Sequence, residues 1–288
     1  MDLSIIIVSW QVKDILRQCL KSIYDQTKNI SFEVIVVDNN SSDGSPAMIK
    51  QEFPSVKLIA NSDNRGFARA NNQGGNIANG DFLIFLNPDT EILDNALGRM
   101  VDYLKNNPAV GILGPQLLNT DHTLQPSIRR FPRLRDQLLI LSKLPNFFPS
   151  LIAGYTAQAF NYKVTQPVEQ VMGAALMFRR EVKERIGLMD EYFWQYFDEI
   201  DFCKLSQEAG WQNWYLAEAK ILHHKGTAFS QQRAVFKQYH WNRSLIYYAG
   251  KHWPAWQVLV LYLVWPFSML LAILQQLFKV KKVKPKYL

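Results

Sequence analysis

The sequence is poor in cysteine and lacks the segments that mark several common protein classes. Its 288 residues contain two cysteines, Cys19 and Cys203, which are far apart and form no CxxC pair. A disulfide scaffold and a cysteine-rich metal site are therefore not indicated. The first ten residues lack the basic region of a signal peptide and begin with a strand-like apolar run. We expect a domain that folds in a reducing, cytosolic compartment.

Acidic residues are absent from the last quarter of the chain. The formal net charge is +7, from 32 Lys and Arg against 25 Asp and Glu. Residues 219–288 hold 11 of the basic residues and no acidic one, which leaves 21 basic residues and all 25 acidic residues in 1–218, a net charge of −4. The excess positive charge belongs to the C-terminal part. It indicates contact with an anionic membrane surface there, and we expect no nucleic-acid partner.

Glycine-rich phosphate-binding loops are also absent. The sequence contains neither GxGxxG nor GxxxxGK[ST], and the first strand-like run is followed by Ser-Trp-Gln-Val-Lys-Asp at residues 9–14. These absences exclude a Rossmann dinucleotide site and a P-loop. No serine or cysteine nucleophile motif is evident either.

The hydrophobic pattern of the first half alternates between strand and helix periods. Buried strands are predicted over residues 3–8, 32–37, 56–60, 81–86 and 110–113, with helices over 12–24, 66–78 and 93–104 and one capped by Ser45 with Pro46 at its first position. This order predicts an α/β fold with a mostly parallel central sheet flanked by helices.

The second half is less regular at first. We expect residues 119–170 to form an insertion that lines or covers the site, with a helix near 135–144. The chain then regains regular structure, with expected elements over residues 171–178 (strand), 199–209 (helix) and 214–222 (strand).

Polar side chains follow several predicted strands directly. They are Ser9 and Trp10, Asp38 and Asn39, Asn64-Arg65-Gly66, and Asn87 and Asp89. Carboxyl ends of parallel strands share one edge of a sheet, so these groups should converge there. One such aspartate alone is more often a turn residue, but four converging loops favour a binding site. With no glycine-rich cradle, a bound diphosphate would need a metal ion, and Asp89 suits Mg²⁺ or Mn²⁺.

Seven segments carry a resemblance to a known family. The sequence resembles the family 2 glycosyltransferases of the GT-A fold, and within them the bacterial rhamnosyltransferase-like branch. The segments are VVDNNSSDG (36–44), NRGFARANNQG (64–74), LNPDT (86–90), MGAALMFRR (172–180), GLMDEYFW (187–194), DEIDFC (198–203) and HHKG (223–226). The resemblance covers about residues 3–250. It implies a nucleotide-sugar-binding half over 1–118, an acceptor-binding half over 119–250 and a membrane-associating tail over 251–288.

The resemblance implies roles for the strand-end residues in holding the donor. Asp38, assisted by Ser9, would contact the pyrimidine base, whereas Asn64, Gly66 and Asn71 would lie near the base, ribose or phosphates.

The same resemblance implies the metal ligands. Asn87-Pro88-Asp89 occupies the Asp-x-Asp position, with Asp89 as the metal-binding carboxylate and Asn87 near the nucleotide sugar. Because Asn87 replaces an aspartate, one carboxylate is present instead of two. His223 has the His-x-x-Gly spacing to Gly226 and would approach the diphosphate or metal, with His224 as the alternative.

The acidic segment 198–201 matches the catalytic motif of the family. Glu199 takes the catalytic-base position, and Asp198 is the alternative because Asp and Glu are exchanged here. Such a carboxylate takes the proton of an acceptor hydroxyl as it attacks. The alternative interpretation is structural: these negative charges stabilise the N-terminus of the following helix. Asp201 fits this interpretation best. Gly173 and Trp194 are assigned to the acceptor side.

The tail from residue 254 to 278 contains no charged residue. Its apolar run is barely long enough to cross a bilayer, is interrupted by Pro266 and Ser268, and precedes the basic segment 279–286. We expect membrane contact and leave open whether the tail spans the bilayer or lies on it. Helices over 239–248 and 253–278 that pack on the domain or on a partner subunit are the alternative.

These observations favour an inverting, metal-dependent glycosyltransferase at the cytoplasmic face of the cell membrane. It would move a sugar, with rhamnose on deoxythymidine diphosphate as first choice, to a glycan or lipid-linked acceptor in cell-surface polysaccharide synthesis. A nucleotidyltransferase would have a basic, glycine-rich turn where residues 9–14 have none. A non-catalytic membrane-associated scaffold is a third reading, against which Asp38, Asp89 and Glu199 are all present.

Overall fold

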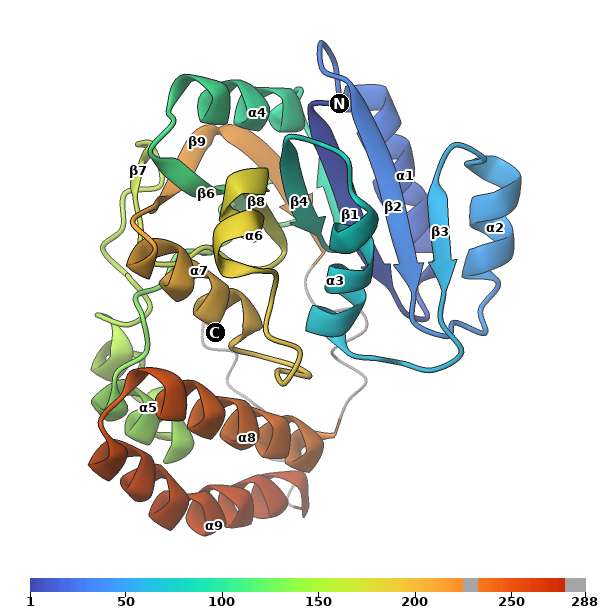
Figure 1. The fold of residues 1–288 in the computed structure, drawn as a ribbon. Helices are drawn as coiled ribbons and strands as arrows, with labels where there is room; N and C mark the ends of the chain where they lie inside the picture. The colour runs from blue at the N-terminus through green and yellow to red at the C-terminus, as the bar shows by residue number, and fades with distance from the viewer. Residues whose placement is uncertain (225–232, 278–288) are drawn as a thin grey trace.

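A central sheet of nine strands organises the computed structural model, which describes residues 1–224 and 233–277. The strands run in the order β3-β2-β1-β4-β8-β6-β9-β5, and β7 pairs with β9 (Figure 1). Their bounds are β1 Leu3–Ser9, β2 Phe32–Asp38, β3 Lys57–Ala60, β4 Phe82–Leu86, β5 Thr90–Ile92, β6 Val110–Leu118, β7 Gln166–Pro167, β8 Ala175–Arg179 and β9 Gln212–His223. The main helices are α1 Lys13–Gln26, α2 Ser45–Glu52, α3 Phe67–Ile77, α4 Ala96–Asn106, α5 Leu134–Leu141, α6 Arg180–Ile186, α7 Asp198–Glu208, α8 Ala234–His252 and α9 Ala255–Leu277.

The first four strands form the parallel part of the sheet, as predicted. β1 pairs in parallel with both β2 and β4, and β2 pairs in parallel with β3. In this register Ser9 is opposite Asp38. The carboxyl ends of these strands therefore meet at one edge, which is the arrangement that the strand-end argument requires.

The remaining strands make the sheet mixed. β8 is antiparallel to both β4 and β6, and β5 is antiparallel to β9. The cause is the path of the chain: β6 ends at the carboxyl edge, residues 119–174 follow it, and β8 starts at that same edge, with Ala175 opposite Leu86. A strand that starts there must run backwards. The prediction of parallel strands is thus confirmed for β1 to β4, whereas β8 and β5 are antiparallel to the strands they pair with.

Helices cover both faces of the sheet because side chains of a strand alternate between its faces. Ile5 and Ile7 of β1 pack in one hydrophobic core with α1, α2 and α4, whereas Ile6 packs in a second core with α3, α6 and α7. Residues 5–7 of β1 are fully buried, because both faces of the strand are covered. This explains why the strand is a continuous apolar segment in the sequence.

The start of α2 differs from the prediction. Ser45 is its first residue rather than its N-cap, and the N-cap is Gly44, whose φ of 85° suits glycine. The Ser45 amide and hydroxyl donate to Asp43 Oδ1 at 3.0 and 2.6 Å, while the Lys13 amide at the start of α1 donates to Asp43 Oδ2 at 2.7 Å. The prediction of a Ser45 cap was wrong because one carboxylate serves the N-termini of both helices.

A third layer lies at the end of the molecule opposite the N-terminus and contains α5, α8 and α9 (Figure 1). Its core joins Leu141 of α5, Leu245 of α8 and Leu261 of α9 to Ile200 of α7. Asp201 of α7, 1% exposed, accepts from Lys251 Nζ and contacts His252 Nε2, both at 2.7 Å. The helical layer is thus fastened to α7 by a buried carboxylate.

This fastening predicts a large effect of Asp201→Ala on stability. Asp201→Ala leaves Lys251 with Asp190 alone and takes the 2.7 Å partner from the buried His252 ring, and breaking a buried pair by removing one partner costs about 3–5 kcal/mol. Urea unfolding should therefore show a loss of about 3 kcal/mol or more. The matched control is Asp63→Ala, which breaks the exposed pair with Arg65 at 3.1 Å and should cost at most about 1 kcal/mol. Equal losses in the two variants would contradict the assignment.

Candidate active site

A cavity of about 450 Å³ opens at the carboxyl ends of β1, β2 and β4. Loops that follow these strands meet there with the start of β8, the start of α7 and the end of β9. Its lining residues are Val8, Trp10, Val12, Asn39, Asn64, Gly66, Phe67, Asn87, Pro88, Asp89, Met172, Gly173, Ala174, Trp194, Gln195, Tyr196, Asp198, Glu199 and His223.

Most of the residues predicted from the sequence share this cavity. Nine line it: Asn64, Gly66, Asn87, Asp89, Gly173, Trp194, Asp198, Glu199 and His223. Ser9, Asp38 and Asn71 are buried and are not part of the lining. Asn71 donates its amide to the Phe67 carbonyl at 3.1 Å, a bond within α3 that supports the helix.

Ser9 and Asp38 bring unpaired polar atoms to the cavity's edge. Ser9 Oγ and Asp38 Oδ1 are buried without a hydrogen-bond partner, whereas Asp38 Oδ2 accepts from the Ser41 amide at 2.8 Å. Burying such an atom unpaired costs about 1–3 kcal/mol. The neighbours of both residues, Trp10 and Asn39, do line the cavity. These two atoms therefore lack partners within the fold, beside two residues that line the cavity.

Asn39 belongs to the strand-end polar residues, received no individual role from the sequence, and lines the cavity. Its Nδ2 donates to Asn64 Oδ1 at 3.3 Å and to the Gly66 carbonyl at 3.2 Å, and its Oδ1 accepts from Asn61 at 3.0 Å. The side chain thereby holds the loop before α3. Its position directly after Asp38 was the available signal.

Gly66 permits a close approach in that loop. Its φ is +81°, and a Cβ added there would lie 2.7 Å from Trp194 Cδ1. The absence of a side chain lets the Trp194 ring lie against the loop. Trp194 also packs on His240 of α8, with ring centroids 4.6 Å apart, so this ring joins the cavity to the helical layer.

Asp89 and His223 face each other across the wall of the cavity. Asp89 Oδ1 lies 3.4 Å from His223 Nε2, and both side chains are less than one-tenth exposed. The β5–β9 pairing, with Thr90 opposite His223, brings them together. Asn87 Nδ2 lies 3.5 Å from the same ring nitrogen.

Gln125 determines which ring nitrogen of His223 carries hydrogen. Its Nε2 donates to Asn119 Oδ1 at 3.0 Å and to the His223 carbonyl at 3.1 Å, so its Oε1 faces His223 Nδ1 at 2.7 Å and accepts from it. In the neutral ring, Nε2 then presents a lone pair toward Asp89 Oδ1. Histidines that ligate metals are oriented in this way.

The donor set fits a divalent cation. One carboxylate and one imidazole favour Mn²⁺ over Mg²⁺, which prefers oxygen ligands alone. No group of three or more His, Cys, Asp or Glu ligands exists among residues 1–224 and 233–277, so other ligands would have to come from a bound diphosphate and water. His224, the alternative, contacts Glu91 Oε1 at 2.6 Å instead and does not line the cavity. Gly226 of the histidine motif lies outside the described residues.

The two carboxylates at the start of α7 have different surroundings. Asp198 is 3% exposed, and its Oδ2 has no hydrogen-bond partner. Burial, together with the neighbouring charge of Glu199, raises the pKa of Asp198 well above its usual range. Asp198 therefore keeps its proton to higher pH than an ordinary carboxyl group, whereas Glu199 is partly exposed in the cavity and is the carboxylate that a hydroxyl of a bound molecule reaches more readily.

Strained backbone holds these carboxylates in position. Tyr196 and Phe197 directly precede α7 and have φ of 65° and 67°, in the left-handed region that costs a bulky residue energy. The turn starts α7 at Asp198 with both acids at the cavity. Asp201, three residues later, points to Lys251 and His252 instead, which agrees with its structural reading.

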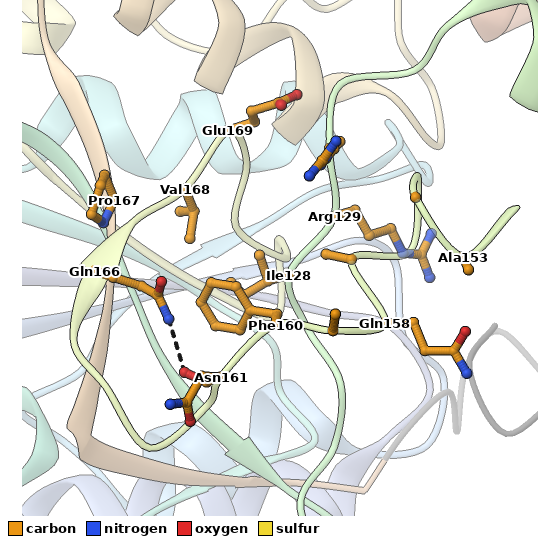
Figure 2. A pocket seen from close by; sticks show the side chains of 14 residues that line it. Ile128, Arg129, Ala153, Gln158, Phe160, Asn161, Gln166, Pro167, Val168 and Glu169 are labelled. Atoms are coloured by element: carbon orange, nitrogen blue, oxygen red, sulfur yellow. Dashed lines mark hydrogen bonds between the residues drawn. The ribbon is translucent and has the colours of Figure 1, made fainter.

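The insertion was expected to line or cover the site, and it does not line this cavity. None of residues 119–170 is part of the lining, whereas Gln125 of the insertion makes two hydrogen bonds to His223. It packs along β9 because Tyr215 donates to the Tyr162 carbonyl at 2.8 Å and the Phe160 ring packs on both tyrosines. There it borders a separate cavity of about 860 Å³, where Gln166 donates to the Asn161 carbonyl (Figure 2).

Comparison with known proteins gives a family match. A model of the family described as "Glycosyl transferase family 2" matches residues 4–186. The chain is 28% identical over 238 residues to the N-acetylglucosaminyl-diphospho-decaprenol L-rhamnosyltransferase of Mycobacterium tuberculosis, a match that covers 78% of this chain and 76% of that protein.

Solved structures are similar in fold at low sequence identity. The mannosyltransferase PcManGT from Pyrobaculum calidifontis, solved with GDP-Man and Mn²⁺, has a TM-score of 0.59 at 18% identity over 94% of this chain and 73% of its own. S. aureus TarS 1–349 with UDP has a TM-score of 0.58 at 13% identity over 85% of this chain and 65% of its own. The expected GT-A fold is confirmed.

The raised pKa of Asp198 predicts a pH-dependent stability. A carboxyl group whose pKa is higher in the folded state stabilises the fold fully below its unfolded pKa of about 3.9, and this contribution is lost as pH rises through the folded pKa. Urea unfolding between pH 4 and 8 should show the wild type losing stability relative to Asp198→Asn. The slope of the difference should approach about 1.4 kcal/mol per pH unit where the pH lies between the unfolded and the folded pKa. Parallel stability curves would contradict the buried, protonated carboxyl.

Proposed function

The chain belongs to glycosyl transferase family 2, and on this premise we propose that it is an inverting, divalent-cation-dependent rhamnosyltransferase acting on a lipid-linked glycan. Family membership makes it a nucleotide-sugar-dependent enzyme rather than a nucleotidyltransferase or a non-catalytic scaffold. One observation carries the proposal: a single cavity holds the Asp89–His223 pair and the Glu199 carboxylate. The printed name of the mycobacterial relative, which gives rhamnosyl transfer to a decaprenol-linked sugar, supports the choice of sugar and acceptor.

The nucleotide of the donor lies at the β1–β2 edge in this proposal. Asp38 Oδ1 and Ser9 Oγ are buried and unpaired, so a pyrimidine base can supply the partners they lack. Asn64, Gly66 and Asn87 extend the same wall toward the Asp89–His223 pair and would contact the ribose and diphosphate. Asn71 supports this wall from within α3.

The diphosphate of the donor lies beside Asp89 and His223. These two residues would hold the cation, with Gln125 fixing the ring of His223. A bound divalent cation supplies positive charge that stabilises the leaving diphosphate. The chain provides little other positive charge among the lining residues, since none of them is Lys or Arg.

Transfer proceeds by single displacement. Glu199 removes the proton of the acceptor hydroxyl as its oxygen forms a bond to the anomeric carbon of the sugar. The bond from that carbon to the diphosphate oxygen breaks at the same time, and its electron pair goes to the departing nucleoside diphosphate. Attack from the opposite face inverts the anomeric centre. Gly173 borders Glu199, since a Cβ added to it would lie 3.4 Å from Glu199 Cβ, and both Gly173 and Trp194 would contact the acceptor.

The proposed acceptor and the charge of the tail support a location at a membrane. A lipid-linked glycan is anchored by its lipid, and the C-terminal part of the chain carries basic residues and no acidic ones. The proposal therefore includes peripheral attachment to the cytoplasmic face of the cell membrane, within cell-surface polysaccharide synthesis.

The base assignment predicts a loss of transfer in Glu199→Gln. Losing a general base costs about 10²–10⁴-fold in rate. Transfer from deoxythymidine-diphosphate rhamnose to an N-acetylglucosaminyl-diphosphate lipid should fall by at least a hundredfold, with donor affinity within about twofold of wild type. Asp198→Asn, the control, should lose less than tenfold. The opposite result would make Asp198 the base, and tighter binding of another nucleotide sugar in a panel would overturn the choice of rhamnose.

The metal assignment predicts weaker Mn²⁺ binding in two variants. Asp89→Ala removes a ligand, and Gln125→Ala releases the ring of His223; losing such an orienting partner costs about 10–100-fold in metal affinity. Mn²⁺ titration followed by electron paramagnetic resonance, with deoxythymidine diphosphate present, measures both. Gln158→Ala, an exposed glutamine in the same insertion, is the control and should leave the affinity unchanged. Wild-type affinity in Gln125→Ala would remove its orienting role.

A further inference from the structure

Helix α9 exposes one continuous apolar face. It has 23 residues and a mean hydropathy of 2.1, and only 17% of its most apolar 18-residue stretch is buried. The exposed apolar side chains recur at intervals of three and four residues, so they share one face of the helix. They are Trp256, Leu259, Leu263, Phe267, Leu270, Leu274 and Leu277, with exposed fractions from 39% to 72%.

The opposite face of α9 is docked on α8. Leu261, Ser268 and Ala272 are buried there, and Ser268 Oγ accepts from Asn242 Nδ2 of α8 at 2.7 Å. The bond joins two side chains that are at most 2% exposed. Contacts run along the length of both helices, which lie antiparallel as a hairpin. The docked face is polar at its centre, unlike the exposed one.

This docking opposes a transmembrane orientation of α9. Along its length α8 carries Lys237, Arg243 and Lys251, so a hairpin that crossed the bilayer would take these charges into hydrocarbon, at about 2.5–3.5 kcal/mol each at the centre. If α9 crossed the bilayer without α8, it would lose the buried Asn242–Ser268 hydrogen bond. It would also leave the hydrophobic core that its Leu261 shares with Leu245 of α8. An orientation parallel to the membrane surface keeps both.

A second apolar segment lies at the same end of the molecule. Phe147 and Phe148 connect two 3₁₀ turns, Leu144–Asn146 and Pro149–Ile152, and are 70% and 60% exposed. Both turns contact α5, and α5 contacts α9 (Figure 1). Large apolar side chains from two segments more than 100 residues apart are thus exposed on one helical layer. Exposed patches of this kind mark an interaction surface.

We propose that this layer binds a lipid bilayer in the plane of its surface, with α9 lying in the interface and Phe147–Phe148 inserted beside it. A bilayer fits better than a second copy of the chain because of charge. The region from residue 219 onward has no acidic residue, and the basic segment 279–286 directly follows α9, so anionic headgroups are complementary to it. Trp256 and Tyr262 on α9 are of the residue types that prefer the membrane–water interface.

The orientation has a consequence for the acceptor, which rests on the proposed function. α8 lies between α9 and the catalytic domain, and its His240 packs against Trp194 on the cavity wall. One helix therefore separates the lipid-facing surface from the cavity. A sugar on a membrane-anchored diphosphate can reach Glu199 while its lipid stays in the bilayer.

The first test is vesicle flotation of the full chain. Vesicles of phosphatidylglycerol and phosphatidylcholine should bind the wild type, and Phe147→Ser/Phe148→Ser should weaken binding at least tenfold. Ile77→Ser/Val164→Ser removes two exposed apolar side chains elsewhere and should leave binding unchanged. Equal binding of all three proteins would overturn the role of Phe147 and Phe148. A wild type that forms dimers and ignores vesicles would assign the surface to a second copy.

The second test separates an in-plane helix from a spanning one. Nitroxide labels at Trp256→Cys, Leu263→Cys and Leu277→Cys report immersion depth in vesicles, and the two native cysteines are buried. An in-plane helix should give three similar, shallow depths. A deep label at position 263 between shallow ones would show a span and overturn the proposal. Vesicle binding and depth do not depend on activity, so they can succeed even if the proposed reaction is wrong.

Discussion

The parallel pairing of β1 with β2 and β4 is the constraint on which the site depends. It sets Ser9 beside Asp38 and ends β4 on the other side of β1, so that the groups proposed to bind the base and the metal share one edge. This pairing is possible only because the strands are buried on both faces, which requires the two helical layers and their separate cores. The chemistry at the edge is therefore a product of core packing rather than of any single loop.

Local sequence was sufficient for the elements that build this edge. The continuous β-branched runs and the helical spacing between them predicted β1 to β4 within one or two residues, and turn-rich polar segments located the strand ends. Asp198 and Glu199, singled out by the acidic segment and by the resemblance of the motifs, both line the cavity, and their catalytic roles stay predictions. The expected division into halves at residue 118 and a tail from residue 251 stays a prediction.

Features that depend on distant pairing could not be predicted in this way. β5 has three residues, too few for a periodic pattern, yet its pairing with β9 is what sets His223 beside Asp89 and leaves His224 on Glu91. Gln125 lies in the irregular insertion, and its role became visible only through its three bonds to Asn119 and His223. The reversed direction of β8 likewise depends on the insertion, because the chain re-enters the sheet at the edge where β4 and β6 end.

The cavity and the helical layer are joined through α7 and α8. The strained turn at Tyr196 and Phe197 precedes Glu199, and two residues later Asp201 is held by Lys251 and His252 at the end of α8. In the first half of α8, His240 packs on Trp194, which lines the cavity. A bilayer bound to α9, as proposed, would thus orient α8 and, through His240, the Trp194 side of the cavity. Membrane attachment and acceptor positioning would then be two effects of the same helix.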